Sequence, residues 1–213
     1  MDAAIHVDIL NRWCELKTRL ADVHVHKVPT SLIGAEKAIT TVSVKLFGMK
    51  SKIALLVIDM QLVAFDGVIT PAITNGDRVL EQVSQTIHTI RSNNLPIIFI
   101  QTCALDGQPY AKDTHGWEIH PSISVKPEDR VVFKPGCSGF DDTTLEQILR
   151  ELKIKSVITC GIWSEYCVTE TSLSALRLGF EVCLVADAHG TVADSEQDAE
   201  ETICKQQCCL SIR

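Results

Sequence analysis

Three side chains of different chemistry stand at the ends of apolar segments. Asp59 follows the apolar run 53–58, Lys134 ends the short run 130–133, and Cys167 lies five residues after the run 156–162. A thiol can attack an acyl carbon, a carboxylate can take and return the proton, and an ammonium group favours the thiolate. These residue types are therefore what a nucleophilic hydrolase that works through a thioester requires.

The surrounding pattern predicts the elements that would position these groups. Continuous apolar runs of this length are typical of strands that are buried on both faces, and they occur at 53–58, 96–100, 130–133, 156–162 and 181–186. Helical patterns fall between them at 75–93, 145–152 and 165–178, and Asp194 or Ser195 can cap a last helix. The alternation predicts a three-layer α/β/α fold with a mostly parallel sheet.

The predicted topology gives a reason for the three groups to meet. In open α/β sheets, ligands bind outside the carboxyl ends of the strands, which is where Asp59, Lys134 and Cys167 are predicted to lie. The polar stretch 103–128 is long enough to be a functional loop. Each residue also has a plainer interpretation, because a lone Asp or Lys at a strand end is usually a turn or surface group. A Cys at a helix start is usually buried and inert.

The helix that follows the fourth strand affects the chemistry expected of Cys167. A helix N-terminus favours negative charge, and a nearby ammonium group from Lys134 would act in the same direction. We therefore expect the pKa of the Cys167 thiol to be lowered. On this basis iodoacetamide would label Cys167 faster than the other eight of the nine cysteines.

Composition limits the remaining possibilities. The chain has 213 residues, a net charge of −7 and no cluster of Lys and Arg, so a nucleic-acid partner is not expected. It has no apolar run of about 18 residues and no secretory signal pattern, so no membrane association is expected. Its cysteines are scattered without a CxxC pair, which favours reduced thiols and a cytoplasmic location.

Weak patterning before the first strand divides the chain into two parts. Residues 1–50 are predicted to form an N-terminal extension, partly helical or an oligomer arm, and residues 51–213 the α/β domain. A dinucleotide-binding domain would show a G-x-G-x-x-G turn after its first strand. The chain has Asp59, Met60 and Gln61 there instead, and a P-loop is absent too.

Four segments in the correct order resemble the isochorismatase-like cysteine hydrolases: 55–61 (LLVIDMQ), 133–140 (FKPGCSGF), 161–168 (GIWSEYCV) and 184–191 (LVADAHGT). The resemblance implies a catalytic triad of Asp59, Lys134 and Cys167. It also implies a cis peptide bond between Ile162 and Trp163, and an oxyanion hole formed by the backbone N–H groups of Trp163 and Cys167.

Departures from the family pattern narrow the predicted activity. Nicotinamidases of this family bind a metal through an acid followed by two histidines after the second strand, and residues 103–109 offer no such set. We therefore expect neither a metal nor another cofactor. Members that lack the cysteine cleave a vinyl ether, so the presence of Cys167 favours cleavage of an amide, imide, ureide or carbamoyl C–N bond. An ether hydrolase and an idle oligomeric scaffold that keeps the fold remain alternatives.

The resemblance also suggests which side chains line the pocket for a small-molecule substrate: Gln61, Phe65, Trp117, His120, Trp163 and Tyr166. For His120 a structural role is favoured, and Tyr166 could point either way. Asp187 and His189 look like a catalytic dyad, but the family pattern assigns them to the turn after the fifth strand. Family members commonly form dimers or larger assemblies, so a homo-oligomer is expected.

Overall fold

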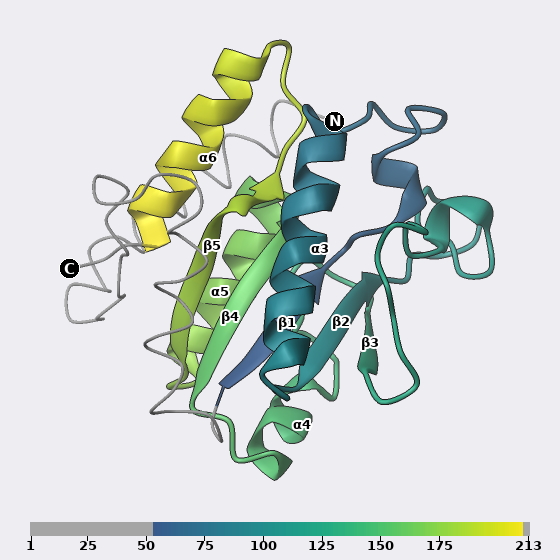
Figure 1. Cartoon of the computed structure of the whole chain (residues 1–213). Coiled ribbons are helices and arrows are strands. Elements are labelled where there is room, and N and C mark those ends of the chain that lie inside the picture. Colours follow the sequence, from purple (N-terminus) through teal and green to yellow (C-terminus); the bar gives the residue numbers. More distant parts are fainter. Residues whose placement is uncertain (1–52, 211–213) are drawn as a thin grey trace.

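The computed structural model describes residues 53–210, with side chains up to residue 206 (Figure 1). The predicted N-terminal extension over residues 1–50 lies outside the described residues. Within residues 53–210, no helix is long and apolar enough to cross a membrane.

Five strands form one parallel sheet in the order β3-β2-β1-β4-β5. They are β1 (Ile53–Ile58), β2 (Ile97–Thr102), β3 (Arg130–Lys134), β4 (Ser156–Ile162) and β5 (Glu181–Gly190). The predicted fold class and all five strands are confirmed. The order reverses beside β1, because β2 and β3 lie on one side of it and β4 and β5 on the other. Such a switch point is where open α/β sheets bind ligands.

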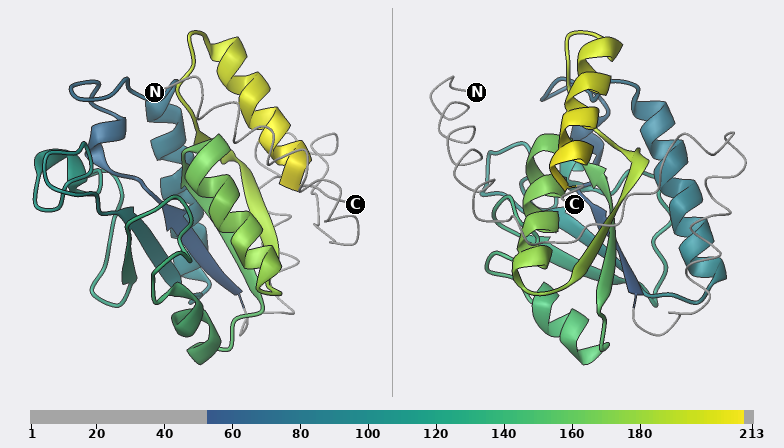
Figure 2. Two further views of the ribbon diagram at one scale, coloured as in Figure 1. Left: turned by 180° about the vertical axis from the view of Figure 1, so that it is seen from behind. Right: turned by 90° about the vertical axis from the view of Figure 1, so that its left-hand side faces the viewer.

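Helices cover both faces of the sheet (Figures 1 and 2). Helix α3 (Gly76–Ser92) packs on one face, and α4 (Leu145–Glu151) and α5 (Thr169–Arg177) pack on the other. Helix α6 (Glu196–Leu210) lies against β5 and α5. Strand β1 is buried on both faces: Leu55 and Val57 point into the α3 core, and Leu56 and Ile58 point into the opposite one. This double burial explains the continuous apolar run in the sequence.

Two elements differ from their predicted bounds. The helix predicted over 165–178 begins as a single π-helical turn, η4 (Ser164–Val168), and continues as α5. The strand predicted over 181–186 continues to Gly190, and its pairing with β4 shifts register between Thr159 and Gly161. Both irregularities lie where the chain leaves the sheet at its carboxyl edge. Their position near Cys167 agrees with the tendency of π-turns to occur at functional sites.

A close approach between β1 and β4 needs a glycine. Gly161 has φ +117°, and a Cβ atom placed on it would stand 2.0 Å from the carbonyl oxygen of Ile58. No other residue fits there without moving one of the two strands. Because Asp59 follows Ile58 and η4 follows Ile162, Gly161 brings the segments that carry Asp59 and Cys167 close together.

Candidate active site

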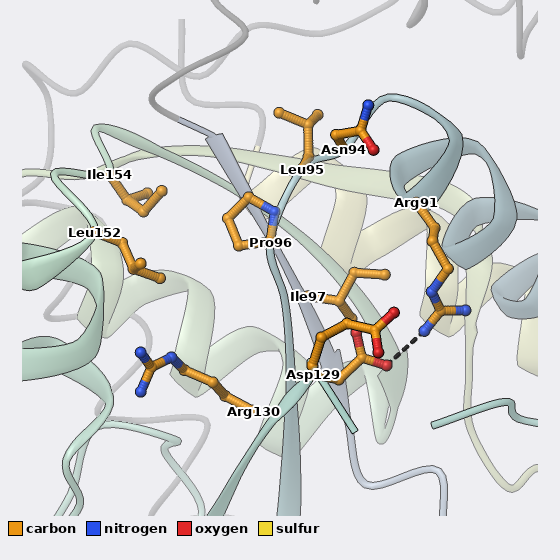
Figure 3. A pocket seen from close by; sticks show the side chains of 10 residues that line it. Arg91, Asn94, Leu95, Pro96, Ile97, Asp129, Arg130, Leu152 and Ile154 are labelled. Carbon is orange, nitrogen blue, oxygen red and sulfur yellow. Dashed lines mark hydrogen bonds and ion pairs between the residues drawn. The ribbon is translucent and has the colours of Figure 1, made fainter. Parts of the chain in front are cut away.

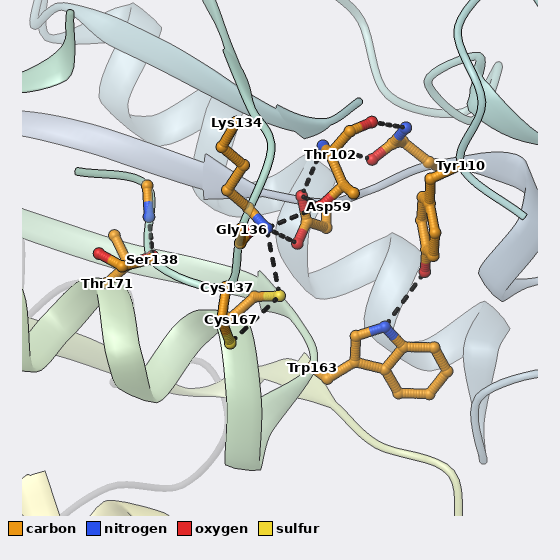
Figure 4. A network of polar contacts seen from close by, with 12 residues as sticks. Asp59, Thr102, Tyr110, Lys134, Gly136, Cys137, Ser138, Trp163, Cys167 and Thr171 are labelled. Atoms are coloured by element: carbon orange, nitrogen blue, oxygen red, sulfur yellow. Dashed lines mark hydrogen bonds and ion pairs between the residues drawn. The ribbon is translucent and has the colours of Figure 1, made fainter. Parts of the chain in front are cut away.

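The ends of three strands bring Asp59, Lys134 and Cys167 into one cluster (Figure 4). The Lys134 Nζ lies 2.9 Å from Oδ2 of Asp59 and 3.3 Å from Sγ of Cys167. Asp59 is 1% exposed, Lys134 0% and Cys167 9%. An acid, an amine and a thiol that are far apart in the sequence therefore share a site that is almost closed to water.

Thr102 at the end of β2 orients the carboxylate of Asp59. Its backbone N–H and its hydroxyl both donate to Oδ1 of Asp59, each over 3.0 Å. The other carboxylate oxygen is left facing Lys134. The backbone of Asp59 is left-handed, with φ +52°, a conformation that Asp tolerates better than most residues.

Lys134 lies at the centre of the hydrogen-bond network. In addition to Asp59 and Cys167, its ammonium group donates to the hydroxyl of Thr102 over 2.7 Å and to the carbonyl oxygen of Gly136 over 2.9 Å. Burial acts to lower the pKa of Lys134, but the negative charges of Asp59 and Cys167 outweigh it and the pKa is raised. The amine therefore stays protonated at neutral pH and cannot act as the general base.

The expectation of a lowered pKa for Cys167 is wrong for the resting site. The contact with a second cysteine, Cys137, raises the pKa of Cys167 most, and burial and the charge of Asp59 raise it further. The ammonium group of Lys134 opposes them without reversing the direction. The sequence shows the helix start and the lysine but neither the contact with Cys137 nor the depth of burial, and these two effects outweigh the ammonium group.

Cys137 was not singled out in the sequence, although it lies in one of the four family-like segments. It sits between β3 and α4, is exposed, and places its sulfur 4.0 Å from the sulfur of Cys167 (Figure 4). The contact with Cys167 lowers the pKa of Cys137, and Lys134 acts in the same direction against burial. Of the two thiols, the exposed one therefore ionises more readily.

We now expect iodoacetamide to label Cys137 before Cys167, because alkylation follows thiolate content and access. Timed labelling at neutral pH followed by peptide mapping measures both rates. Cys204 is also exposed but stands outside the cluster, so it gives the rate of an ordinary surface thiol in the same experiment. Faster labelling of Cys167 than of Cys137 would contradict the assignment.

Gln61 is fully buried and supports the site from behind. Its side-chain Nε2 donates to the carbonyl oxygens of Thr102 (3.0 Å) and Trp117 (2.9 Å), and its Oε1 accepts from the N–H of Thr102 (2.9 Å). These bonds occupy both ends of the side-chain amide. Gln61, which was predicted to line the pocket, thus fixes the end of β2 and, through Thr102, the carboxylate of Asp59.

Trp163 and Tyr110 form a second pair beside the cluster (Figure 4). The peptide bond between Ile162 and Trp163 is cis, as the family resemblance implied. The Trp163 indole Nε1 donates to the hydroxyl oxygen of Tyr110 over 3.1 Å. Burial raises the pKa of Tyr110, and the charges of Asp59 and Cys167 raise it further. Tyr110 was not predicted, because it lies in the long loop where no periodic pattern marks it.

The other predicted pocket residues lie around this centre in separate contacts. The rings of Phe65 and His120 are 5.2 Å apart, and those of Trp117 and Phe133 are 5.5 Å apart. Burial lowers the pKa of His120. Burial also raises the pKa of Tyr166, and the charges of Glu165 and Cys137 raise it further.

Asp187 and His189 do not form a dyad. Asp187 is exposed, whereas His189 is buried and its Nδ1 lies 2.9 Å from the hydroxyl of Ser164, the first residue of η4. His189 therefore ties the turn that carries Cys167 to the end of β5. Burial lowers the pKa of His189 to about 4.

Mild acid should destabilise the fold through His189. The unfolded chain takes up a proton near the ordinary pKa of 6.5, but the folded chain does so only near 4. Stability is therefore complete above pH 6.5 and falls between pH 6.5 and 4, by about 3 kcal/mol in all. Urea unfolding across this range should show a shallower decline for His189→Gln than for the exposed control His88→Gln. Equal declines in both variants would contradict the assignment.

A hollow of about 590 Å³ lies at the opposite edge of the sheet (Figure 3). Its lining includes Pro96 and Ile97 at the start of β2, Arg130 at the start of β3, and Ile154 just before β4. These are the amino ends of the strands, whereas the cluster of Asp59, Lys134 and Cys167 lies at the carboxyl ends. The hollow is thus separate from the candidate site.

The described residues also bear on metal binding. Among residues 53–206, no group of three or more His, Cys, Asp or Glu side chains is arranged to hold a metal ion. The described cluster itself offers one carboxylate, two thiols and an ammonium group. Lys134 provides the positive charge that contacts both Asp59 and Cys167.

A parallel sheet with this strand order and an Asp, Lys and Cys cluster at its carboxyl edge defines the isochorismatase-like class of α/β proteins. The chain belongs to the isochorismatase family, whose isochorismatase domain matches residues 53–209. This match confirms the resemblance stated from the four segments.

Individual relatives show what the chain is similar to. It is 36% identical over 141 residues to a streptothricin hydrolase from Streptomyces noursei. The matched region covers 65% of this chain and 54% of that protein. The chain thus spans about half the length of the curated relatives it matches first. Two solved structures are 26% identical: the pyrazinamidase of Pyrococcus horikoshii in complex with zinc (TM-score 0.66, 74% of this chain and 96% of that one) and the N-carbamoylsarcosine amidase from Thermoplasma acidophilum (TM-score 0.60, 69% and 88%).

Proposed function

We propose that the protein is a cysteine hydrolase that cleaves a C–N bond in a small amide, imide, ureide or carbamoyl compound through a thioester. The observation that carries the proposal is the position of Lys134, whose Nζ contacts both the carboxylate of Asp59 and the sulfur of Cys167. A buried ammonium group in contact with both can stabilise the thiolate that forms when the proton leaves the sulfur.

The first half of the reaction transfers an acyl group to the enzyme. Asp59 takes the proton of the Cys167 thiol, and the sulfur attacks the carbonyl carbon of the substrate. The resulting C–O⁻ is held by the backbone N–H groups of Trp163 and Cys167, and Asp59 returns the proton to the leaving nitrogen as the C–N bond breaks. The raised pKa of Cys167 is consistent with this order, because the thiol stays protonated until a substrate arrives.

The second half releases the acid. Asp59, ionised again, takes a proton from a water molecule that attacks the thioester carbon. The C–S bond breaks, and the sulfur leaves as a thiolate next to Lys134 and recovers its proton from Asp59. Lys134 keeps its proton throughout, in agreement with its raised pKa. No redox step or external cofactor is needed for this sequence.

The relatives support the reaction class. Three of them are named as hydrolases or amidases: a streptothricin hydrolase, a pyrazinamidase and an N-carbamoylsarcosine amidase. The alternative of vinyl ether cleavage uses acid catalysis without a thiol, so it gives no role to Cys167. The homo-oligomer and the cytoplasmic location remain predictions, which light scattering of the purified chain and cell fractionation would test.

A panel of amides tests the proposal directly. Streptothricin, pyrazinamide and N-carbamoylsarcosine represent the compounds in the relatives' names, and liquid chromatography with mass spectrometry follows their hydrolysis. Acid quenching during turnover should trap an acyl adduct on Cys167, and hydroxylamine should remove it. Hydrolysis without any adduct on Cys167, or with an adduct on another residue, would overturn the thioester mechanism.

Tyr110 is a further residue that we assign to substrate positioning. An indole N–H can only donate, so the Tyr110 oxygen accepts from Trp163 and its own proton is available for another acceptor. The raised pKa keeps that proton in place across the working pH range. The pair of Tyr110 and Trp163 lies beside the cluster of Asp59, Lys134 and Cys167, where a substrate bound to Cys167 could accept this hydrogen bond (Figure 4).

Loss of the Tyr110 hydroxyl should weaken binding of a substrate that accepts its hydrogen bond. For Tyr110→Phe we expect kcat/KM to fall on the order of tenfold, mainly through KM, because one hydrogen bond contributes about 0.5–1.5 kcal/mol. Steady-state kinetics on the best substrate of the panel measures both constants. The comparison variant Tyr166→Phe removes the other phenol expected near the pocket, so it shows whether the loss is particular to Tyr110. An equal loss in the two variants would argue against a specific role of Tyr110.

A further inference from the structure

The two cysteines of the site are close enough to react with each other. Their sulfurs are 4.0 Å apart, and they come from different parts of the chain, Cys137 between β3 and α4 and Cys167 in η4 (Figure 4). A disulfide needs its sulfurs at about 2.0 Å, so one side chain must move by about 2 Å. The proposed hydrolysis does not use Cys137.

The structure around Cys137 allows this movement. Cys137 is exposed, and beyond its two chain neighbours the adjacent Gly136 has no atom within 4 Å of the position that a Cβ would occupy. Cys167, by contrast, is nearly closed off, and the hydrogen bond from the N–H of Val168 to the carbonyl oxygen of Trp163 helps to hold its turn. The exposed partner is therefore both the one that an oxidant reaches and the one that can shift.

Other cysteines of the described chain provide a contrast. Cys160 is fully buried in the α3 core, and burial raises its pKa. Cys183 is half-buried on β5, and burial raises its pKa as well. Cys204 is exposed on α6. Within residues 53–206, Cys137 and Cys167 are the cysteines that lie in contact with each other beside an ammonium group.

We propose that Cys137 and Cys167 form an oxidant-sensitive dithiol, which a hydroperoxide converts into a disulfide that masks the nucleophile. Formation of the bond does not require the chain to be a hydrolase. Its consequence for activity rests on the proposed function. The oxidant is hydrogen peroxide or an organic hydroperoxide, and a small thiol reverses the change.

The chemistry balances in two steps. The thiolate of Cys137 attacks one oxygen of the peroxide and the O–O bond breaks. The products are a Cys137 sulfenic acid and hydroxide, or an alkoxide when the oxidant is an organic hydroperoxide. The sulfur of Cys167 then attacks the sulfur of Cys137, the S–S bond forms, and the S–OH oxygen leaves as water with the proton from Cys167. Overall, the two thiols lose two electrons and two protons, and the peroxide is reduced to the level of water.

Such a disulfide would protect the site as well as switch it off. A sulfenic acid that meets no thiol is oxidised further to sulfinic acid, which small thiols do not reverse. A resolving thiol at 4.0 Å intercepts that step. The pair thus predicts a reversible disulfide in the native chain and irreversible sulfinic acid on Cys137 when Cys167 is absent.

Peptide mapping tests the bond without any need for activity. The full-length reduced chain is treated with hydrogen peroxide, its remaining thiols are blocked with N-ethylmaleimide, and it is digested without reduction. Trypsin separates Cys137 from Cys167 at Arg150, and chymotrypsin cleaves after Trp163 and so separates Cys160 from Cys167. We expect a cross-linked pair of peptides that carry Cys137 and Cys167, which dithiothreitol resolves into two thiols.

Two variants serve as controls. Cys167→Ser should yield no cross-link and should accumulate sulfinic acid on Cys137 as peroxide is raised. Cys204→Ser lacks an exposed thiol that takes no part in the cluster and should cross-link like the native chain. A native chain in which Cys137 and Cys167 stay unlinked under peroxide, or in which Cys167 links to a different cysteine, would overturn the proposal.

The activity readout separates this proposal from the proposed function. With a hydrolysed substrate of the panel, the fraction of activity lost should equal the fraction of chain cross-linked, and dithiothreitol should restore both. If a cross-link forms but the native chain hydrolyses nothing in the panel, the dithiol stands and the hydrolase proposal loses support. If hydrolysis proceeds unchanged in fully cross-linked protein, Cys167 is not the nucleophile.

Discussion

Replacement of Cys167 by alanine or serine should abolish hydrolysis while the fold is kept. The thioester can form only on this sulfur, and we expect kcat to fall on the order of 10³-fold or more. Serine is the informative variant, because its hydroxyl fits the space but is far harder to deprotonate than a thiol. Substrate loss by liquid chromatography measures the activity, and thermal unfolding by circular dichroism checks the fold.

A second thiol so close to the first makes the control essential. Cys137 lies 4.0 Å from Cys167, is exposed and ionises more readily, so it could be taken for the nucleophile. Cys137 lacks the direct contact with Lys134 that Cys167 makes. If Cys137→Ser removed activity and Cys167→Ser did not, Cys137 would be the nucleophile. The expected pattern is the reverse, with the acyl adduct on Cys167 alone.

Much of the fold could be predicted from the sequence because the sheet is parallel and covered on both faces. A strand such as β1 needs apolar side chains on both sides, which produces a continuous apolar run with sharp ends. Asp59 and Lys134 are polar residues at the ends of such runs, so they stand out in the sequence as candidate site residues. The rule that parallel strands present their carboxyl ends at one edge then predicts that the groups meet.

The site residues that were not predicted lie in connections, where neither hydrophobic periodicity nor sheet topology indicates a position. Tyr110 belongs to the long connection after β2, and its path past Trp163 depends on tertiary packing. Cys137 lies in the short segment after β3. The sequence of this segment resembles the family, but it does not show that Cys137 lies against Cys167. The pKa of Cys167 shows a further limit, because it depends on burial and on the neighbouring thiol. Neither can be read from the order of residues.

Lys134 provides the second large effect, since stability and catalysis both depend on its charge. Lys134→Met removes the ammonium group and leaves the Asp59 carboxylate, 1% exposed, without its counter-charge. Breaking a buried pair in this way costs about 3–5 kcal/mol. We expect the free energy of unfolding in urea to fall by that amount, and hydrolysis to be lost as well, because the thiolate would have no partner.

The double variant Asp59→Asn/Lys134→Met separates the two roles. It removes both charges, and a buried ion pair replaced by neutral groups often costs little, so most of the lost stability should return. Thr102 can still donate to the oxygen of the new Asn side chain, provided that this oxygen takes the place of Oδ1. Activity should not return, because the base and the cation are both gone. A double variant as unstable as the sum of the two single ones would show that the pair matters to folding beyond its charge. A folded Lys134→Met variant that still hydrolyses at the native rate would remove Lys134 from the mechanism.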